Sequence, residues 1–152
     1  MPARTEPVAI ERQRRLLLRH GFLFLFLALW LGIATAVLPH ARAWLAAHLT
    51  AFLTSLILVA IGLVWRELRL TDRQRAVAFG AGFVSAYLGL VANVFGAIVD
   101  LPGPASSPGV APPMPQAVVF FSMLAVIVPS TLIAFGLVAY GMRGDPEIEV
   151  RT

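Results

Sequence analysis

Four long runs of apolar residues, separated by short polar connections, dominate the chain. They cover approximately residues 16–38, 44–65, 76–99 and 117–142. A helix needs about 20 mostly apolar residues to cross the hydrocarbon core of a bilayer, and each run is long enough. The pattern therefore predicts an all-α membrane protein with four transmembrane helices. We expect residues 1–152 to form one domain, because no long polar segment separates the runs.

The arginines predict how these helices are oriented. Eleven of the twelve lie in the N-terminal arm, in the connection between the second and third runs, and in the tail, whereas Arg42 alone lies in the other connections. Positive residues accumulate on the cytoplasmic side of a membrane, so both termini are expected to be cytoplasmic in a bacterial-type inner membrane. The apolar region of a signal peptide is about 7–15 residues long. The first run is longer, so it is expected to be a retained helix.

Composition removes several classes of function. The chain is 59% hydrophobic and 13% charged, whereas a soluble domain is about 45–50% apolar and about 25% charged, so a soluble enzyme or binding domain is excluded. Cysteine is absent, which excludes disulfides, thiolate metal sites and a cysteine nucleophile. The basic residues flank apolar runs and form no aromatic-interleaved basic face. The expected partners are therefore the lipid bilayer and its anionic headgroups, with no nucleic acid.

The connections differ in character. Residues Pro39 to Ala43 are so few that the first two spans must be antiparallel neighbours. Residues Asp100 to Gln116 contain six prolines, which predicts an irregular outer rim that is neither helix nor strand. Thr71 and Asp72 form a plausible N-cap pair for the third span. Pro129 is expected to kink the fourth span.

Each span carries a polar residue in the outer half of the membrane, and His48 and Asn93 are the most informative. Polar side chains inside a bilayer are costly and often functional. The residues that share a helix face with Asn93 are small: Gly82, Ala86, Gly89 and Gly96. The face of His48 carries Ala51, Ser55, Val59 and Gly62. Small residues admit a flat cofactor or a neighbouring helix. Each feature also has a structural alternative. The small faces can serve ordinary helix packing, His48 can be an interfacial histidine that bonds a neighbour, and Asn93 can form an interhelical hydrogen bond.

The residues that are missing narrow the chemistry further. No two carboxylates lie within the spans, so a paired-carboxylate hydrolase and a di-iron bundle are excluded. His20 and His48 begin successive antiparallel spans, which places them at opposite faces of the bilayer and prevents one chain from joining them on one metal ion. If the chain binds haem, it most simply offers His48 as one axial ligand and leaves the other face of the iron open.

Short motifs carry a family resemblance. They are His20-Gly21, Ala47-His48, and Ala92-Asn93-Val94 followed by the Pro/Gly-rich connection. In order and spacing the chain, from about Ile10 to Met142, resembles the styrene oxide isomerase family of four-span membrane enzymes. The resemblance implies a homotrimer with haem b at subunit interfaces and His48 as the iron ligand. It also implies that ferric iron acts as a Lewis acid and opens a small lipophilic epoxide, which becomes an aldehyde by a 1,2-shift.

The remaining site residues follow from the resemblance together with the small-residue faces of the second and third spans. Asn93 and Thr54 are expected to be catalytic, and Ser55 and Gly89 to contact the haem. Two positions depart from the family pattern: Thr54 stands where the family has asparagine, and Ala97 where it has tyrosine. Thr54 retains a hydroxyl group, but Ala97 cannot hydrogen-bond through its side chain. Phe52, Phe95, Phe120 and Phe121 are candidates for the pocket lining.

These departures keep two other functions open. One is a haem protein with another role, such as electron transfer, sensing or different haem chemistry, which the alanine at position 97 favours. The other is an accessory or transport subunit without a cofactor, which the absence of charged side chains near the middle of the membrane favours.

Overall fold

The computed structural model describes residues 8–99 and 114–143, and these residues form four α-helices and no strand. The helices are α1 (Val8–Val37), α2 (Ala41–Val64), α3 (Asp72–Ile98) and α4 (Met114–Gly141). All four are long and apolar enough to cross a membrane. The predicted all-α membrane fold is therefore confirmed, whereas the cytoplasmic location of the termini stays a prediction.

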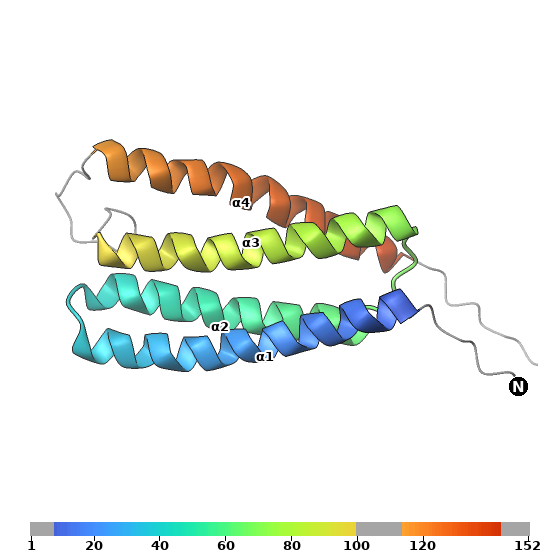
Figure 1. The fold of residues 1–152 in the computed structure, drawn as a ribbon, viewed down its shortest axis with the longest axis horizontal. Coiled ribbons are helices and arrows are strands. Elements are labelled where there is room, and N and C mark those ends of the chain that lie inside the picture. Colours follow the sequence, from blue (N-terminus) through green and yellow to red (C-terminus); the bar gives the residue numbers. More distant parts are fainter. Residues whose placement is uncertain (1–7, 100–113, 144–152) are drawn as a thin grey trace, which may run out of the picture.

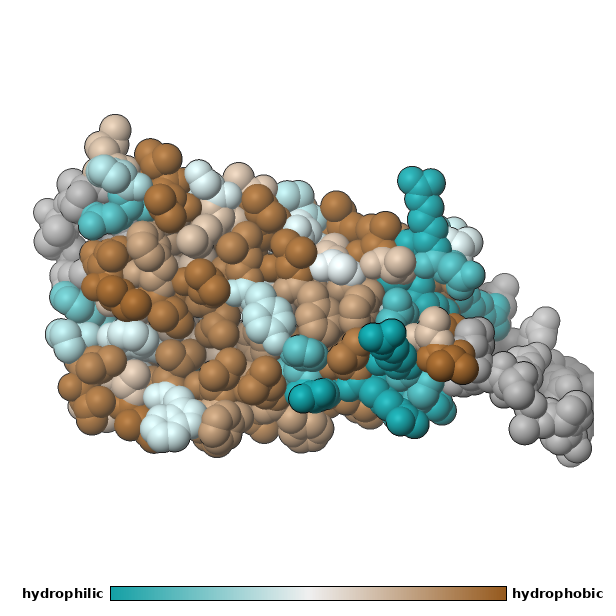
Figure 2. Space-filling model, in the orientation of Figure 1, coloured by the Kyte–Doolittle hydropathy of each residue, from teal (hydrophilic) through white to brown (hydrophobic). Residues whose placement is uncertain are grey.

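The helices lie side by side in chain order (Figure 1). Helix α1 packs against α2, α3 packs against α4, and α2 joins the two pairs. The buried residues at these contacts are mostly small or aliphatic, with two aromatic exceptions, Phe24 and Trp65. Large apolar side chains such as Phe22, Trp30 and Leu132 point outward. Figure 2 accordingly shows a brown, apolar surface over most of the length and the deepest teal where α1 begins.

Helix α1 begins at Val8, about two turns before the apolar run. Glu11 supports this extension, because its carboxylate accepts a hydrogen bond from Arg15 Nε at 2.7 Å and lies 3.6 Å from Arg14 Nη1. Such pairs, three and four residues apart, stabilise a helix. Hydrogen bonds from Arg15 and then from Arg66 lower the pKa of the Glu11 carboxyl from 4.5 to about 2. The arginine-rich arm is therefore helical from Val8 onward.

The α2–α3 connection is held by side chains on backbone groups. Thr71 is the N-cap of α3, and with Gln74 it forms a capping box, which confirms the predicted cap. Arg75 is only 6% exposed, and its guanidinium donates to the carbonyl oxygens of Trp65 and Leu68, each at 2.6 Å. Orphan carbonyls at a helix end need such partners. Arg75 thus closes the end of α2 and is not an exposed flanking charge.

The α1–α2 and α3–α4 connections, at the other end of the helices, differ from each other. Between α1 and α2, His40 adopts a left-handed conformation (φ 62°), which histidine tolerates better than most residues. Residues 100–113, most of the predicted proline-rich rim, lie outside the described residues. The expectation that residues 100–116 contain no helix is wrong at its end, because α4 already begins at Met114. Pro115 fits the first turn of α4, where no helical partner for an N–H is needed.

Candidate functional site

His48 packs against α1, where its ring forms one hydrogen bond and fills a gap left by a residue without a side chain. Its ring Nδ1 lies 2.7 Å from the carbonyl oxygen of Ala28. The gap is at Gly32, where an added Cβ would lie 3.3 Å from ring atoms Cε1 and Nδ1 of His48. On its own helix the ring stacks on Phe52, with 6.5 Å between the ring centres. The contacts with α1 therefore fix both the position of His48 and the orientation of its ring.

The hydrogen bond also selects the tautomer of His48. A carbonyl oxygen can only accept, so Nδ1 carries the proton and a neutral ring keeps the lone pair on Nε2. A metal-ligating histidine is usually arranged in this way, with its other nitrogen bonded to a carbonyl or carboxylate. Among residues 8–99 and 114–143 no three His, Cys, Asp or Glu side chains gather to hold a metal ion. In this tautomer His48 offers Nε2 as its ligating atom.

A pocket of about 240 Å³ opens between α2, α3 and α4. Its walls are mainly apolar, with hydroxyl and amide groups among them. The polar lining residues are Thr50, Thr54, Ser85, Asn93 and Thr131. An apolar protein cavity of about 150 Å³ holds benzene, so this pocket has room for one aromatic ring with a small substituent.

Asn93 and Thr54 supply hydrogen-bonding groups to this pocket. The Asn93 amide donates through Nδ2 to the carbonyl oxygen of Gly89 at 2.9 Å, which fixes the amide and leaves Oδ1 as an acceptor. No residue in the described parts of the chain bonds the Thr54 hydroxyl. Gly89 is buried, yet an added Cβ would meet nothing within 4 Å. The small-residue face of α3 therefore lines open space around Gly89.

The structure brings three of the five predicted site residues together and separates the other two. Thr54, Gly89 and Asn93 line the pocket. His48 lies on the side of α2 that faces α1, and so does Ser55, which is 1% exposed. There Gly21 of α1 packs so closely that an added Cβ would lie 3.2 Å from the Ser55 carbonyl oxygen. Within one chain, His48 is thus on the far side of α2 from the pocket.

Several of the polar and aromatic candidates lie elsewhere. Phe120 lines the pocket, whereas Phe121 is exposed. Thr35 and Ser122 donate to carbonyl oxygens of their own helices, at 3.0 Å and 2.8 Å. Their hydroxyl groups are therefore satisfied locally and do not build a shared site.

Sequence reasoning missed two polar features. Thr50 and Ser85 line the pocket four residues before Thr54 and Gly89, a one-turn spacing that could have indicated a shared face. The second feature is a hydrogen bond between Nδ1 of His20 and the hydroxyl group of Tyr87, which joins α1 to α3. No pattern along the chain predicts that pair, because it depends on how distant helices pack.

Comparison with known proteins agrees with this architecture. The sequence model of the styrene oxide isomerase family matches residues 13–143. A hydroxylaminobenzene mutase from Ectopseudomonas oleovorans is 26% identical over 136 residues, which cover 87% of this chain and 82% of that protein. No solved structure matches. Because the family match spans most of the chain, this membrane protein belongs to the styrene oxide isomerase family.

Proposed function

We propose that the protein is a membrane-embedded isomerase that converts a one-ring aromatic epoxide into an aldehyde, with haem b bound through His48. Family membership and the mutase relative support an isomerase-type function in a membrane. The observation that carries the substrate class is the pocket of about 240 Å³, in which Thr54 and Asn93 stand among apolar walls. A lipophilic epoxide can reach it directly from the bilayer.

The reaction needs no second substrate. One ring C–O bond of the epoxide breaks, a substituent migrates with its electron pair to the adjacent carbon, and the oxygen becomes a carbonyl group. When bound, haem b supplies a ferric Lewis acid that polarises the epoxide oxygen. Atoms and electrons balance within one molecule, so no hydride donor or water is consumed.

The chain itself binds and protects the substrate. Asn93 Oδ1 and the Thr54 hydroxyl orient a polar substituent, since both groups line the pocket. The apolar walls, including Ile57, Leu58 and Phe120, exclude water, which would otherwise add to the electron-poor carbon and yield a diol. On the other side of α2, the hydrogen bond to the Ala28 carbonyl places the proton of a neutral His48 ring on Nδ1 and leaves Nε2 for iron.

Because His48 and the pocket lie on different faces of α2, we infer that the complete site forms between copies of the chain. In a ring of identical subunits, each interface joins two different surfaces, so His48 of one copy can meet Thr54 and Asn93 of the next. A homotrimer with haem at its interfaces, as the family resemblance implies, satisfies this condition.

A second candidate is the isomerisation of an aromatic hydroxylamine, which the mutase relative favours. Thr54, which lines the pocket, and Ala97, which does not, are also the two positions that depart from the pattern implied by the resemblance. Both substrates combine one ring with a small oxygen-bearing substituent and fit the same volume. Purified protein loaded with haemin should convert styrene oxide to phenylacetaldehyde. Conversion of hydroxylaminobenzene alone would assign the second activity, and conversion of neither would overturn the proposal.

Mixed subunits test where the site forms. His48→Ala and Asn93→Ala should each inactivate the protein when expressed alone. Co-expressed in equal amounts, they should restore roughly a quarter of wild-type activity, because about one interface in four in a cyclic oligomer then joins an intact His48 to an intact Asn93. No recovery would show that both residues act within one chain, because every chain then carries a defect.

A further inference from the structure

The start of α1 carries an arginine-lined groove that the isomerase function does not use. The groove has a volume of about 840 Å³ and lies where α1 meets the end of α2. Arg12, Arg15, Arg19 and Arg66 line it together with one carboxylate, Glu11. Positive charge among these residues therefore exceeds negative charge by three. Figure 2 shows the corresponding teal cluster at the edge of the apolar surface.

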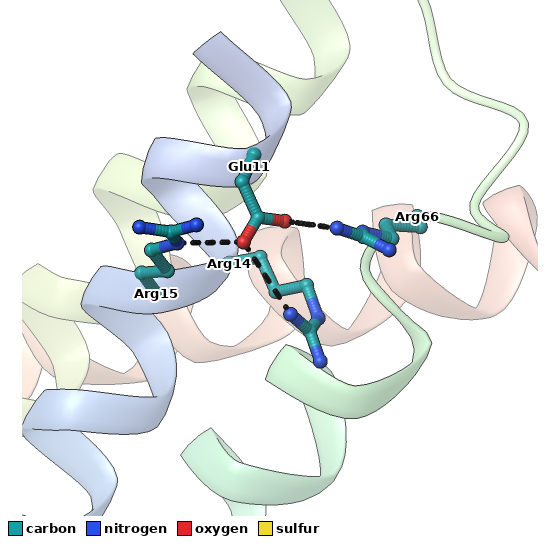
Figure 3. Close-up of polar contacts among 4 residues, drawn as sticks. All are labelled: Glu11, Arg14, Arg15 and Arg66. Atoms are coloured by element: carbon teal, nitrogen blue, oxygen red, sulfur yellow. Dashed lines mark hydrogen bonds and ion pairs between the residues drawn. The ribbon is translucent and has the colours of Figure 1, made fainter. Parts of the chain in front are cut away.

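Glu11 fixes part of this cluster and leaves the rest available. Its carboxylate binds Arg15 and Arg66, with Arg66 Nε at 3.1 Å (Figure 3). With a pKa of about 2, Glu11 stays ionised at neutral pH and holds both guanidinium groups in place. In the described parts of the chain neither Arg12 nor Arg19 forms an ion pair. An anion that enters the groove thus meets two positioned arginines and two that lack a carboxylate partner.

The face of α1 that carries Arg12, Arg15 and Arg19 continues into the apolar part of this helix. Residues 12, 15, 19, 23, 26, 30 and 33 follow each other at spacings of three and four, which is one face of a helix. The last four are Leu23, Phe26, Trp30 and Ile33, and all of them are exposed. Phe26 and Trp30 contact edge to face, with 6.3 Å between the ring centres. A strip of arginines therefore leads into a strip of exposed apolar and aromatic side chains.

The dimensions of this face match one leaflet of a bilayer. Trp30 is eleven residues beyond Arg19, or about 16 Å along the helix at 1.5 Å per residue. Half of a hydrocarbon core of about 30 Å is about 15 Å. An acyl chain whose headgroup lies at Arg19 would thus extend along Phe26 as far as Trp30.

We propose that this groove and strip bind an anionic phospholipid, with its phosphate on Arg12, Arg15, Arg19 and Arg66 and an acyl chain along Leu23, Phe26 and Trp30. Basic pockets at the inner ends of transmembrane helices recognise such headgroups. A second copy of the chain is a poorer occupant, because copies in one membrane carry their arginines at the same depth and repel each other. A free phosphate would use the arginines but not the apolar strip.

The test compares lipid binding to protein purified in a neutral detergent, with bound lipids counted by native mass spectrometry. Wild type should bind phosphatidylglycerol at least about tenfold more tightly than phosphatidylcholine of the same chain length. Each arginine near an anionic headgroup contributes about fivefold in affinity, so Arg12→Gln/Arg19→Gln should lower the affinity about 25-fold. Glutamine maintains helix propensity, and circular dichroism checks that the variant stays folded.

A matched control removes the same charge elsewhere. Arg69 and Arg73 are exposed on the α2–α3 connection and do not line the groove, so Arg69→Gln/Arg73→Gln should change the affinity less than about threefold. An equal loss in both double variants, or no preference for phosphatidylglycerol, would overturn the proposal.

Two further measurements separate the lipid from other occupants. Trp30→Ala should weaken the binding of long-chain phosphatidylglycerol but leave the binding of glycerophosphate unchanged. If glycerophosphate binds as tightly as the lipid, the groove is a simple anion site and the proposal is wrong. If Arg12→Gln/Arg19→Gln changes the number of subunits in the mass spectrum and leaves the lipid count unchanged, the face is a subunit contact and the proposal is equally overturned.

Discussion

The substitution Gly32→Ala should lower the affinity for haem without lowering the stability of the helix bundle. In the structure a Cβ at position 32 would lie 3.3 Å from two ring atoms of His48, a few tenths of an ångström closer than ordinary contact. The ring must shift away from α1, and the shift lengthens its 2.7 Å hydrogen bond to the Ala28 carbonyl. The variant therefore weakens the hydrogen bond that holds the proposed iron ligand and retains the histidine itself.

The size of the effect follows from that hydrogen bond. Loss of the outer partner of a metal-ligating histidine costs about 10–100-fold in metal affinity, and the same loss is expected here for haem. Alanine in place of glycine within a helix adds about 0.5–1 kcal/mol of stability, so the cofactor-free variant should unfold no more easily than wild type. Gly32→Val, with two further methyl groups, should bind haem more weakly still.

Haemin titration followed at the Soret band measures the affinity, and circular dichroism during heating measures the stability. Gly136→Ala is the matched control, because a Cβ at position 136 meets nothing within 4 Å and should leave haem affinity unchanged. Wild-type haem affinity in Gly32→Ala would show that the contact of Gly32 with His48 does not affect haem binding, and an equal loss in Gly136→Ala would show that the effect is not specific to His48.

Three other substitutions test separate parts of the structure. Gly89→Leu fills the pocket and should lower turnover about tenfold or more while haem content, read from the Soret band, stays unchanged; loss of haem instead would contradict the separate placement of pocket and His48. Arg75→Met leaves the carbonyl groups of Trp65 and Leu68, in the α2–α3 connection, without this donor and should cost about 2–4 kcal/mol in the free energy of unfolding, against about 0.5 kcal/mol for the exposed Arg73→Met. The pKa of Glu11 falls on folding from 4.5 to about 2, so its ion pairs stabilise the protein above pH 4.5 and are lost as the pH falls toward 2. Glu11→Gln should remove that acid dependence, measured as thermal unfolding across the same pH window, and an unchanged dependence would assign it to another group.

Much of the fold could be predicted from the sequence, because membrane spans depend on local hydropathy. The four helices and the Thr71 cap agree with it. The early start of α1 at Val8 was not predicted, since hydropathy does not register turns that ion pairs such as Glu11–Arg15 stabilise. The burial of Arg75 was missed for a similar reason, because the carbonyl groups of Trp65 and Leu68 that it bonds lie in the connection after α2.

The site was predictable only as faces of single helices. The spacing of Gly89 and Asn93 correctly placed both on one face of α3. It could not show that Thr54 faces α3 while its neighbour Ser55 faces α1, because a side chain's direction acquires meaning only when the neighbouring helix is known. The separation of His48 from the pocket has the same origin and leads to the inference that two copies share a site.

The most direct test of the account is the absorption spectrum of the purified protein with haemin, recorded for wild type, His48→Ala and His20→Ala together with styrene oxide turnover. His20 bonds Tyr87 of α3 and does not line the pocket, so it serves as the histidine control. We expect a Soret band and aldehyde formation in wild type and His20→Ala, and neither in His48→Ala. A Soret band that survives in His48→Ala, or turnover without haem, would contradict this expectation.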